Sequence, residues 1–473
     1  MRTLLANFAI ITQMKLPNPL NTSPLIQKFQ WVADPIGYME SSVQQYPDIF
    51  TGKLVGFGDT VVFVNHPEAI KEIFTNDRKK FIAAGELNKI LKPFLGDYSF
   101  LSIDGDLHKR QRQLVMPSFH GDRMKAYGQL ICSLTEKTFR ELPLGNVFSC
   151  RDVTQDISLQ VILGAIFGLY EGKRYQQLKH LLPSLLDYFR SPLTSSLFFF
   201  SFLQQDFGAW SPWGKFLRSR QQIDELLYSE IAKRREKPDP DRIDILSLLM
   251  LAKDEAGQAM TDVELRDQMM TLLLGGYEST ATVIAWALYW IHQKPLVHEK
   301  LLQELSTLGD SPDPMSIYRL PYLTAVCNES MRIHPILMFS FPRLVQEPVE
   351  LLGHSLEPGM VLLASIYLTH HRKDLYPEPK LFKPERFLER QFSPYEFLPF
   401  GGGVRRCIGE TLGQFEIKLV LATILSNYQL ALADNRPERP QRRGFTLAPA
   451  SGVKMVIRGR RESPLYMATT YAY

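Results

Sequence analysis

The chain has 473 residues, of which 45% are hydrophobic and 22% are charged, and its formal net charge is +4. This composition is that of an ordinary globular protein, and so small a positive charge argues against nucleic-acid binding. Four cysteines are too few for the disulfide framework of a secreted domain, so we expect a cytoplasmic protein.

The two ends of the chain differ from the rest. Leu4 to Thr12 is mildly apolar, but a membrane-spanning helix needs about twenty residues, and no clear cleavage site follows. We therefore expect no membrane anchor, and we take residues 1–16 as an N-terminal extension or leader with a natural start at Met14. No linker interrupts residues 17–461, which we expect to form a single domain, and residues 462–473 are expected to be a loose tail.

Helical periodicity dominates the chain after an early β pattern. Phe50–Val55 and Thr60–Val64 are typical of strands with a turn at Gly56–Asp59. A helix is predicted from Pro67 to Phe74, and from Asp104 to about Leu305 nearly every segment has the spacing of an amphipathic helix. The predicted fold class is therefore mainly α with a small β region.

One predicted helix is unusually long. Thr261 and Glu264 fit a capping box, and the apolar pattern then continues to Gln293, before Pro295. That is about thirty residues, or roughly 45 Å, so we expect this helix to cross the whole domain.

The centre of this helix carries a candidate proton-delivery pair. Gly275 and Gly276 each cost about 1 kcal/mol relative to alanine in a helix, which indicates a kink or a close contact between crossing helices. Glu278 and Ser279 place an acid beside a hydroxyl between apolar turns. This pair favours a catalytic interpretation over a packing contact alone.

The C-terminal third contains an acid and an arginine at i and i+3, Glu329 and Arg332. Alone they predict an exposed ion pair of little stability, since the same spacing recurs at Glu171 and Arg174. Short extended runs follow at 349–352 and 361–365. A final hairpin is predicted between Phe445 and Ile457, turning at Ser451-Gly452.

The segment from Phe400 to Gly409 is the most informative in the chain. Cys407 follows three glycines, is flanked by Arg405 and Arg406, and precedes a helical pattern. Positive charge and a helix N-terminus both lower the pKa of a cysteine and favour the metal-binding thiolate. One thiolate is too few for a structural zinc site or an iron–sulfur cluster. It is enough for haem, whose porphyrin supplies the other in-plane ligands; the alternative is an inert buried cysteine.

These motifs resemble those of the cytochrome P-450 family, over roughly residues 17–458. The family's haem-loop pattern F-x-x-G-x-R-x-C-x-G is met at five positions: Phe400, Gly403, Arg405, Cys407 and Gly409. Glu278 and Ser279 resemble the acid–alcohol pair of the family's long helix, with serine where threonine is usual. Because of this serine, we expect oxygen activation to release more peroxide per product formed. The sequence as a whole is similar to those of soluble cyanobacterial members of the family.

The resemblance implies a haem (heme b) with Cys407 as the axial thiolate ligand of its iron. It implies a buried cluster of Glu329, Arg332 and Arg386 that braces the cysteine loop and does no chemistry, and removing one member would strand a buried charge. It also implies basic partners for the haem propionates. These expected partners are His108, Arg112, Arg343 and Arg405.

For the reaction, the resemblance implies insertion of one atom of O2 into a small apolar substrate such as a long-chain fatty acid, alkane or terpenoid. The aromatic-rich segment 185–213 is expected to cover the substrate. Electrons are expected from a ferredoxin and its ferredoxin reductase docking near Lys109, Arg110 and Arg406 on a monomeric enzyme. The alternatives are a peroxide-driven peroxygenase or isomerase, and a non-catalytic haem or lipid sensor.

Overall fold

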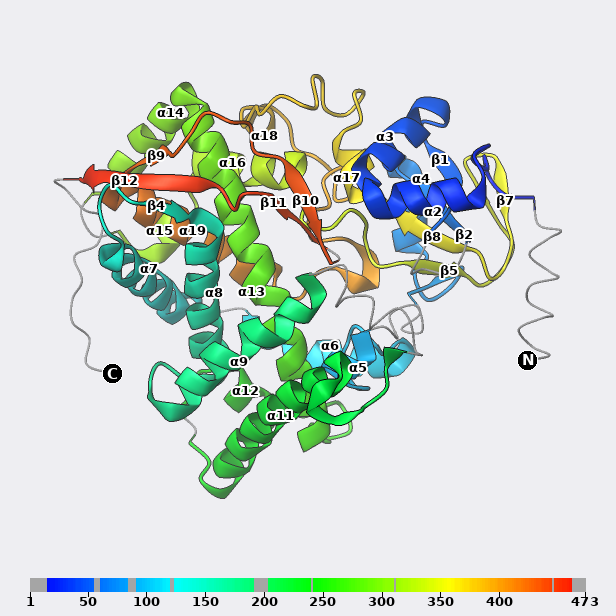
Figure 1. The fold of residues 1–473 in the computed structure, drawn as a ribbon. Coiled ribbons are helices and arrows are strands. Elements are labelled where there is room, and N and C mark those ends of the chain that lie inside the picture. The colour runs from blue at the N-terminus through cyan, green and yellow to red at the C-terminus, as the bar shows by residue number, and fades with distance from the viewer. Residues whose placement is uncertain are drawn as a thin grey trace. The chain divides into compact units, whose positions relative to one another are not determined.

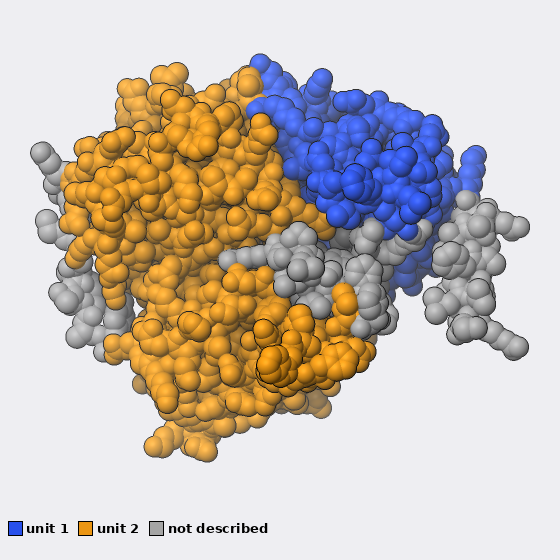
Figure 2. Space-filling view, viewed as in Figure 1, with its two compact units in different colours: residues 1–88, 337–380, 392–407 blue, residues 89–336, 381–391, 408–473 orange. Residues whose placement is uncertain are grey.

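The computed structural model describes residues 15–54, 60–83, 91–119, 123–190, 203–239, 241–309, 312–444 and 446–461. The expected leader as far as residue 14, the turn at Gly56–Asp59 and the tail 462–473 lie outside these ranges. The chain divides into two compact units, which Figure 2 colours separately. Unit 1 comprises residues 1–88, 337–380 and 392–407, and unit 2 comprises residues 89–336, 381–391 and 408–473.

Unit 1 is built on a five-stranded sheet with the order β1-β2-β8-β5-β3 (Figure 1). Its strands are β1 (Ile49–Lys53), β2 (Thr60–Val64), β3 (Phe81–Ile82), β5 (Arg343–Val345) and β8 (Val361–Ala364). β1 and β2 pair antiparallel, which confirms the predicted early strands. β2 and β8 are parallel, so residues about 300 positions apart lie side by side, with Val61 opposite Val361.

Within its described residues, unit 1 also contains four α-helices, each with buried residues, and one short 3₁₀ turn. They are α2 (Pro24–Ala33), α3 (Pro35–Gln45), α4 (Pro67–Thr75), α17 (Ile366–His370) and the short 3₁₀ turn η5 (Gly403–Arg405), and β6 (Val349–Leu351) pairs with β7 (His354–Leu356). Ile70 and Phe74 of α4 share one apolar core with Val62 and Leu362 of the sheet. Burying each such side chain stabilises the unit by about 1.5–3 kcal/mol.

Unit 2 holds most of the helices (Figure 1). They are α5 (Lys92–Leu95), α6 (Gly105–Val115), η2 (Met116–Phe119), α7 (Arg123–Glu141), α8 (Cys150–Phe167), α9 (Gly172–Arg190), η4 (Gly208–Trp210), α11 (Pro212–Glu236), α12 (Ile245–Leu251), α13 (Asp262–Gln293), α14 (Pro295–Ser306), α15 (Pro314–Tyr318), α16 (Pro321–Ile333), α18 (Arg386–Glu389) and α19 (Glu410–Asn427). The predicted long helix is confirmed as α13, whose 32 residues begin at the Thr261–Glu264 capping box.

The strands of unit 2 correct one prediction. β12 (Lys454–Arg460) pairs with β4 (Val147–Ser149) and β9 (Tyr428–Leu432), whereas β11 (Thr446–Pro449) pairs with β10 (Pro440–Arg443). The hairpin expected across Ser451-Gly452 is therefore wrong, although both of its strands exist. The carboxylate of Glu438 accepts hydrogen bonds from the backbone N–H groups of Ser451 and Val453, at 3.0 and 3.2 Å. Val453 has a φ of +59°, which redirects the chain.

The prediction of a mainly helical fold with a small β region is confirmed by these elements. Within the described ranges, no helix combines the length and the apolar character that crossing a membrane requires.

Candidate functional site

The cysteine loop of unit 1 is closed by its own backbone. The N–H of Cys407 donates to the carbonyl of Phe400 at 2.9 Å, and the N–H of Arg406 donates to that of Gly403 at 3.2 Å. Gly403 has a φ of +64°, which favours glycine. Cys407 itself is exposed.

Glycine is also required in this loop by close contacts. A Cβ at Gly402 would lie 2.3 Å from the ring of Phe74, and one at Gly403 would lie 2.0 Å from Oδ2 of Asp77. Neither distance is possible for a real side chain. Residues 402 and 403 therefore pack so closely against Phe74 and Asp77 that only glycine fits at either position.

The donor set of this loop fits haem. Among the described residues, no group of three His, Cys, Asp or Glu side chains could hold a metal ion. A single thiolate suits a metal whose other in-plane ligands come from a porphyrin.

Two arginines expected at the haem propionates lie in unit 1. Arg405 donates through NH2 to the carbonyl of Ala83 at 2.6 Å, and its guanidinium lies 4.4 Å from the ring centroid of Phe341. Arg343 is 1% exposed and forms a buried ion pair with Asp77, with Nε 2.5 Å from Oδ1. Its contacts in this unit thus run to Asp77 and to loop carbonyls.

The other two expected propionate partners lie on α6 of unit 2. His108 and Arg112 are one helical turn apart, with His108 buried and Arg112 half-buried. Arg110, expected at the surface for an electron donor, is paired with Asp254 at 2.6 Å and Glu264 at 2.8 Å. The hydrogen bond to Asp254 raises the pKa of Arg110, and we leave this residue out of the proposed docking surface.

The centre of α13 places the candidate relay residues in consecutive positions. The hydroxyl of Ser279 donates to the carbonyl of Gly275 at 2.6 Å, which leaves its oxygen available as an acceptor. A Cβ at Gly276 would lie 2.3 Å from Cδ1 of Ile162 on α8, whereas one at Gly275 would meet nothing within 4 Å. Gly276 therefore serves the close approach of two helices, and Gly275 does not.

Glu278 has a buried partner that the sequence does not indicate. Arg151, at the start of α8, is 1% exposed and donates through NH2 to the Glu278 carboxylate. Its Nε donates to the hydroxyl of Thr282 at 3.2 Å and its NH1 to the side-chain oxygen of Gln155 at 3.1 Å. The acid of the relay is thus held by a fixed guanidinium on the neighbouring helix.

The predicted ionic cluster of unit 2 is confirmed. Glu329 accepts from Nε of Arg332 at 2.6 Å and from Nε of Arg386 at 3.2 Å, and also from the backbone N–H of Lys383 at 2.9 Å. Glu329 and Arg332 are fully buried. The second copy of the spacing behaves differently, because Arg174 pairs with Glu230 instead of the nearby Glu171.

A further buried acid, Glu416 on α19, was not singled out by its sequence context. Ser158 of α8 donates its hydroxyl to Oε1 of Glu416 at 2.5 Å. Burial raises the pKa of Glu416 to about 8. In the sequence, Glu416 is marked only by its place nine residues after Cys407, and this place does not indicate that its side chain is buried.

The expected substrate-covering segment is only partly described. Phe198, Phe199, Phe200 and Phe202 lie outside the described residues. Trp213 is 7% exposed and packs against Phe216, with ring centroids 5.1 Å apart, so it belongs to the core. Trp210, by contrast, is 94% exposed.

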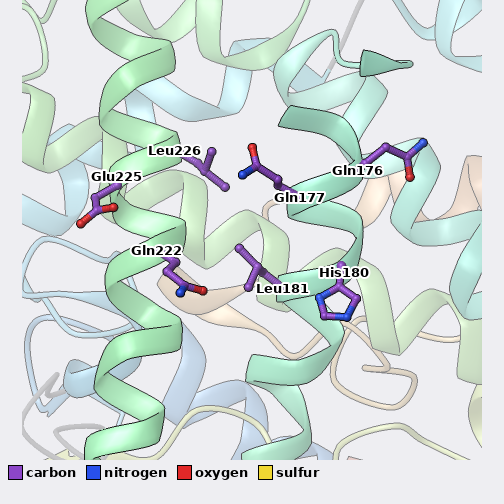
Figure 3. Close-up of a pocket in the computed structure, with 7 residues that line it drawn as sticks. All are labelled: Gln176, Gln177, His180, Leu181, Gln222, Glu225 and Leu226. Carbon is purple, nitrogen blue, oxygen red and sulfur yellow. The ribbon is translucent and has the colours of Figure 1, made fainter. Parts of the chain in front are cut away.

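A surface hollow of about 580 Å³ lies between α9 and α11 (Figure 3). Gln177 and Leu181 project from α9 toward Gln222 and Leu226 on α11 (Figure 3). None of the expected haem or relay residues lines it, so we assign it no part in the reaction.

Comparison with solved structures identifies the fold. Cyanobacterial CYP120A1 with bound retinoic acid matches with a TM-score of 0.82 and 22% identity, covering 95% of this chain and 100% of that chain. The haem domain of cytochrome P450DA matches with a TM-score of 0.81 and 20% identity, covering 95% and 98%. These two likenesses show the fold of this chain.

Sequence comparison identifies the family. The family model described as Cytochrome P450 matches residues 17–455. Cytochrome P450 135B1 of Mycobacterium tuberculosis is 33% identical over 455 residues, covering 95% of this chain and 93% of the relative. Cytochrome P450 138 of the same species is 30% identical over 452 residues, covering 94% and 97%. The chain belongs to the cytochrome P450 family: it is a monooxygenase with a haem-thiolate cofactor, which uses O2, a substrate and electron-transfer partners.

Proposed function

We propose that this monooxygenase hydroxylates an apolar substrate of the long-chain fatty acid, alkane or terpenoid class. The observation that carries the reaction type is the exposed Cys407 on its closed glycine loop. Haem bound there through the thiolate supplies the oxygen activation of the family. The protein's own residues hold the cofactor and deliver protons.

The proposal gives the haem seven residues. Cys407 binds the iron, Phe400 and Gly403 shape the loop, and four basic side chains face the propionates. Those four are His108, Arg112, Arg343 and Arg405. Support is uneven among them: Arg405 carries its charge on the loop itself, whereas the guanidinium of Arg343 already pairs with Asp77.

Glu278 and Ser279 are proposed as the proton-delivery pair. The Ser279 hydroxyl, which donates to Gly275 in this structure, can rotate to donate toward a reacting oxygen and accept a proton in return. Glu278 would take up a proton from solvent and pass it to the Ser279 oxygen, returning to the carboxylate form, and Arg151 would fix the position of that carboxylate. Serine lacks the methyl that restrains the threonine rotamer, so this delivery is expected to be looser.

The substrate class is proposed from chemistry and from the neighbours of the fold. A structural neighbour was solved with retinoic acid, an apolar terpenoid acid. Apolar and aromatic side chains are plentiful in the segment expected to cover the substrate, which favours apolar ligands. For electrons we propose a ferredoxin and its reductase, with the exposed Lys109 and Arg406 contributing to docking.

Titration of the purified holoenzyme with a panel of fatty acids, alkanes and terpenes tests this proposal. A ligand that displaces water from the haem iron shifts the Soret band, and we expect a saturable shift with at least one apolar class. Product formation should then require O2 and a ferredoxin system. Turnover by peroxide alone would favour a peroxygenase, and binding without any turnover would favour a sensor.

A further inference from the structure

Asp77 occupies a tight turn of unit 1 that follows α4. The N–H of Arg78 donates to the carbonyl of Phe81 at 2.7 Å, which closes the turn and starts β3. β3 pairs with β5, the strand that carries Arg343. The Asp77 side chain is only 2% exposed, so the fold places a buried carboxylate directly opposite this arginine.

The side chains of Asp77 and Arg343 both form hydrogen bonds with the backbone of the cysteine loop. Oδ1 and Oδ2 of Asp77 accept from Nε and NH2 of Arg343, at 2.5 and 3.0 Å. Oδ2 also accepts from the backbone N–H of Val404 at 2.9 Å, and NH2 of Arg343 donates to the carbonyl of Gly402 at 3.1 Å. One N–H and one C=O of the loop are thus bound to a single buried ion pair.

The residue between these two contacts, Gly403, lies close against Asp77. A Cβ at Gly403 would lie 2.0 Å from Oδ2 of Asp77, so this glycine is seated against the carboxylate. The carbonyl of Gly403 accepts from the N–H of Arg406, immediately before Cys407. Fixing residues 402–404 therefore fixes the turn from which the cysteine is presented.

We propose that Asp77 is a positioning residue for Cys407, acting through Arg343 and the backbone of residues 402–404. The inference rests on the proposed haem site and adds a residue to it. Arg343 uses Nε and NH2 on Asp77 and on the loop, and NH1 on the carbonyl of Phe341. This arginine therefore holds the loop in addition to the propionate contact proposed above.

Removing the carboxylate would disturb the loop in a predictable way. In Asp77→Asn the buried guanidinium of Arg343 would lose its counter-charge. The amide keeps only one oxygen, so the donors now bound by the other carboxylate oxygen would face an NH2 group and lose their acceptor. The loop would then populate more than one arrangement. The Cys407 thiolate would then occupy more than one position relative to the haem, and the haem would dissociate faster.

The test compares Asp77→Asn with Asp374→Asn in the full-length holoenzyme. Asp374 is a matched control because it pairs with Arg372 in the same unit but is 60% exposed. We would measure the rate of haem transfer to excess apomyoglobin and the electron paramagnetic resonance spectrum of the ferric haem. For Asp77→Asn we expect at least about tenfold faster haem loss and a split or broadened low-spin signal, and for Asp374→Asn neither.

The spectrum separates positioning from general destabilisation. A lower melting temperature with an unchanged low-spin signal and an unchanged rate of haem loss would overturn the inference. If Asp77→Asn does not accumulate as folded protein, Asp77→Glu retains the charge with a longer arm, and the same two readouts should move in the same direction. A wild-type protein that binds no haem through thiolate would instead refute the proposed function.

Discussion

The buried carboxyl of Glu416 predicts how the stability of this enzyme depends on pH. Its pKa is raised from 4.5 to about 8 by burial, and Ser158 donates to it. Between those two values the folded state retains a proton that the unfolded state releases. Stability should therefore fall as the pH rises through this window and level off above pH 8.

The magnitude follows from linkage. Each pH unit inside the window costs about 1.4 kcal/mol for one proton. Wild type should therefore lose roughly 2–3 kcal/mol between pH 5 and pH 7 from Glu416 alone. Glu416→Gln is neutral at every pH and can still accept from Ser158, so it should escape this loss.

Urea unfolding of wild type and Glu416→Gln at pH 5, 6, 7 and 8 provides the assay. The free energy of unfolding of the variant relative to wild type should be smallest at pH 5 and grow by about 1 kcal/mol per pH unit. Glu299→Gln, an exposed site, is the control and should show a constant difference. A pH-independent difference for Glu416→Gln would refute the reasoning.

Three further outcomes are expected. Ser279→Ala should raise the share of consumed oxygen that appears as peroxide, and unchanged coupling would count against a relay role. Glu329→Gln should lower the free energy of unfolding by about 3–5 kcal/mol, since two buried arginines lose their shared carboxylate; a loss below about 1 kcal/mol in urea unfolding would contradict this. A double-mutant cycle of Arg151→Met and Glu278→Gln should give a coupling energy of about 1.5–3 kcal/mol in urea unfolding, and additive effects would mean that their contact is not formed in solution.

Local sequence patterns predicted the parts of this enzyme that depend on local rules. The capping box at Thr261 and the proline after Gln293 bounded α13 correctly, because helix ends are set by residues within one turn. The loop around Cys407 could be recognised because its glycines and charges lie within ten residues. The hairpin near Ser451 failed because Glu438, outside the pattern, decides how that turn is bonded.

The partners of the site residues could not be predicted in this way. Arg151 meets Glu278 across 127 positions, and Asp77 meets Arg343 across 266. Nothing near Arg151 or Asp77 in the sequence distinguishes it from a solvated surface charge. Burial and pairing between distant segments are set by tertiary packing, which short-range spacing does not encode.

The hydrogen bonds between Asp77 and the cysteine loop can form only long after Asp77 itself has been synthesised. Val404 lies 327 positions after Asp77. At about 5–20 residues per second, the ribosome needs roughly 16–65 s to travel from one to the other. The nascent chain therefore carries the Asp77 carboxylate without its backbone partner throughout this interval, and a cysteine held ready for haem exists only after residues 402–407 have been made.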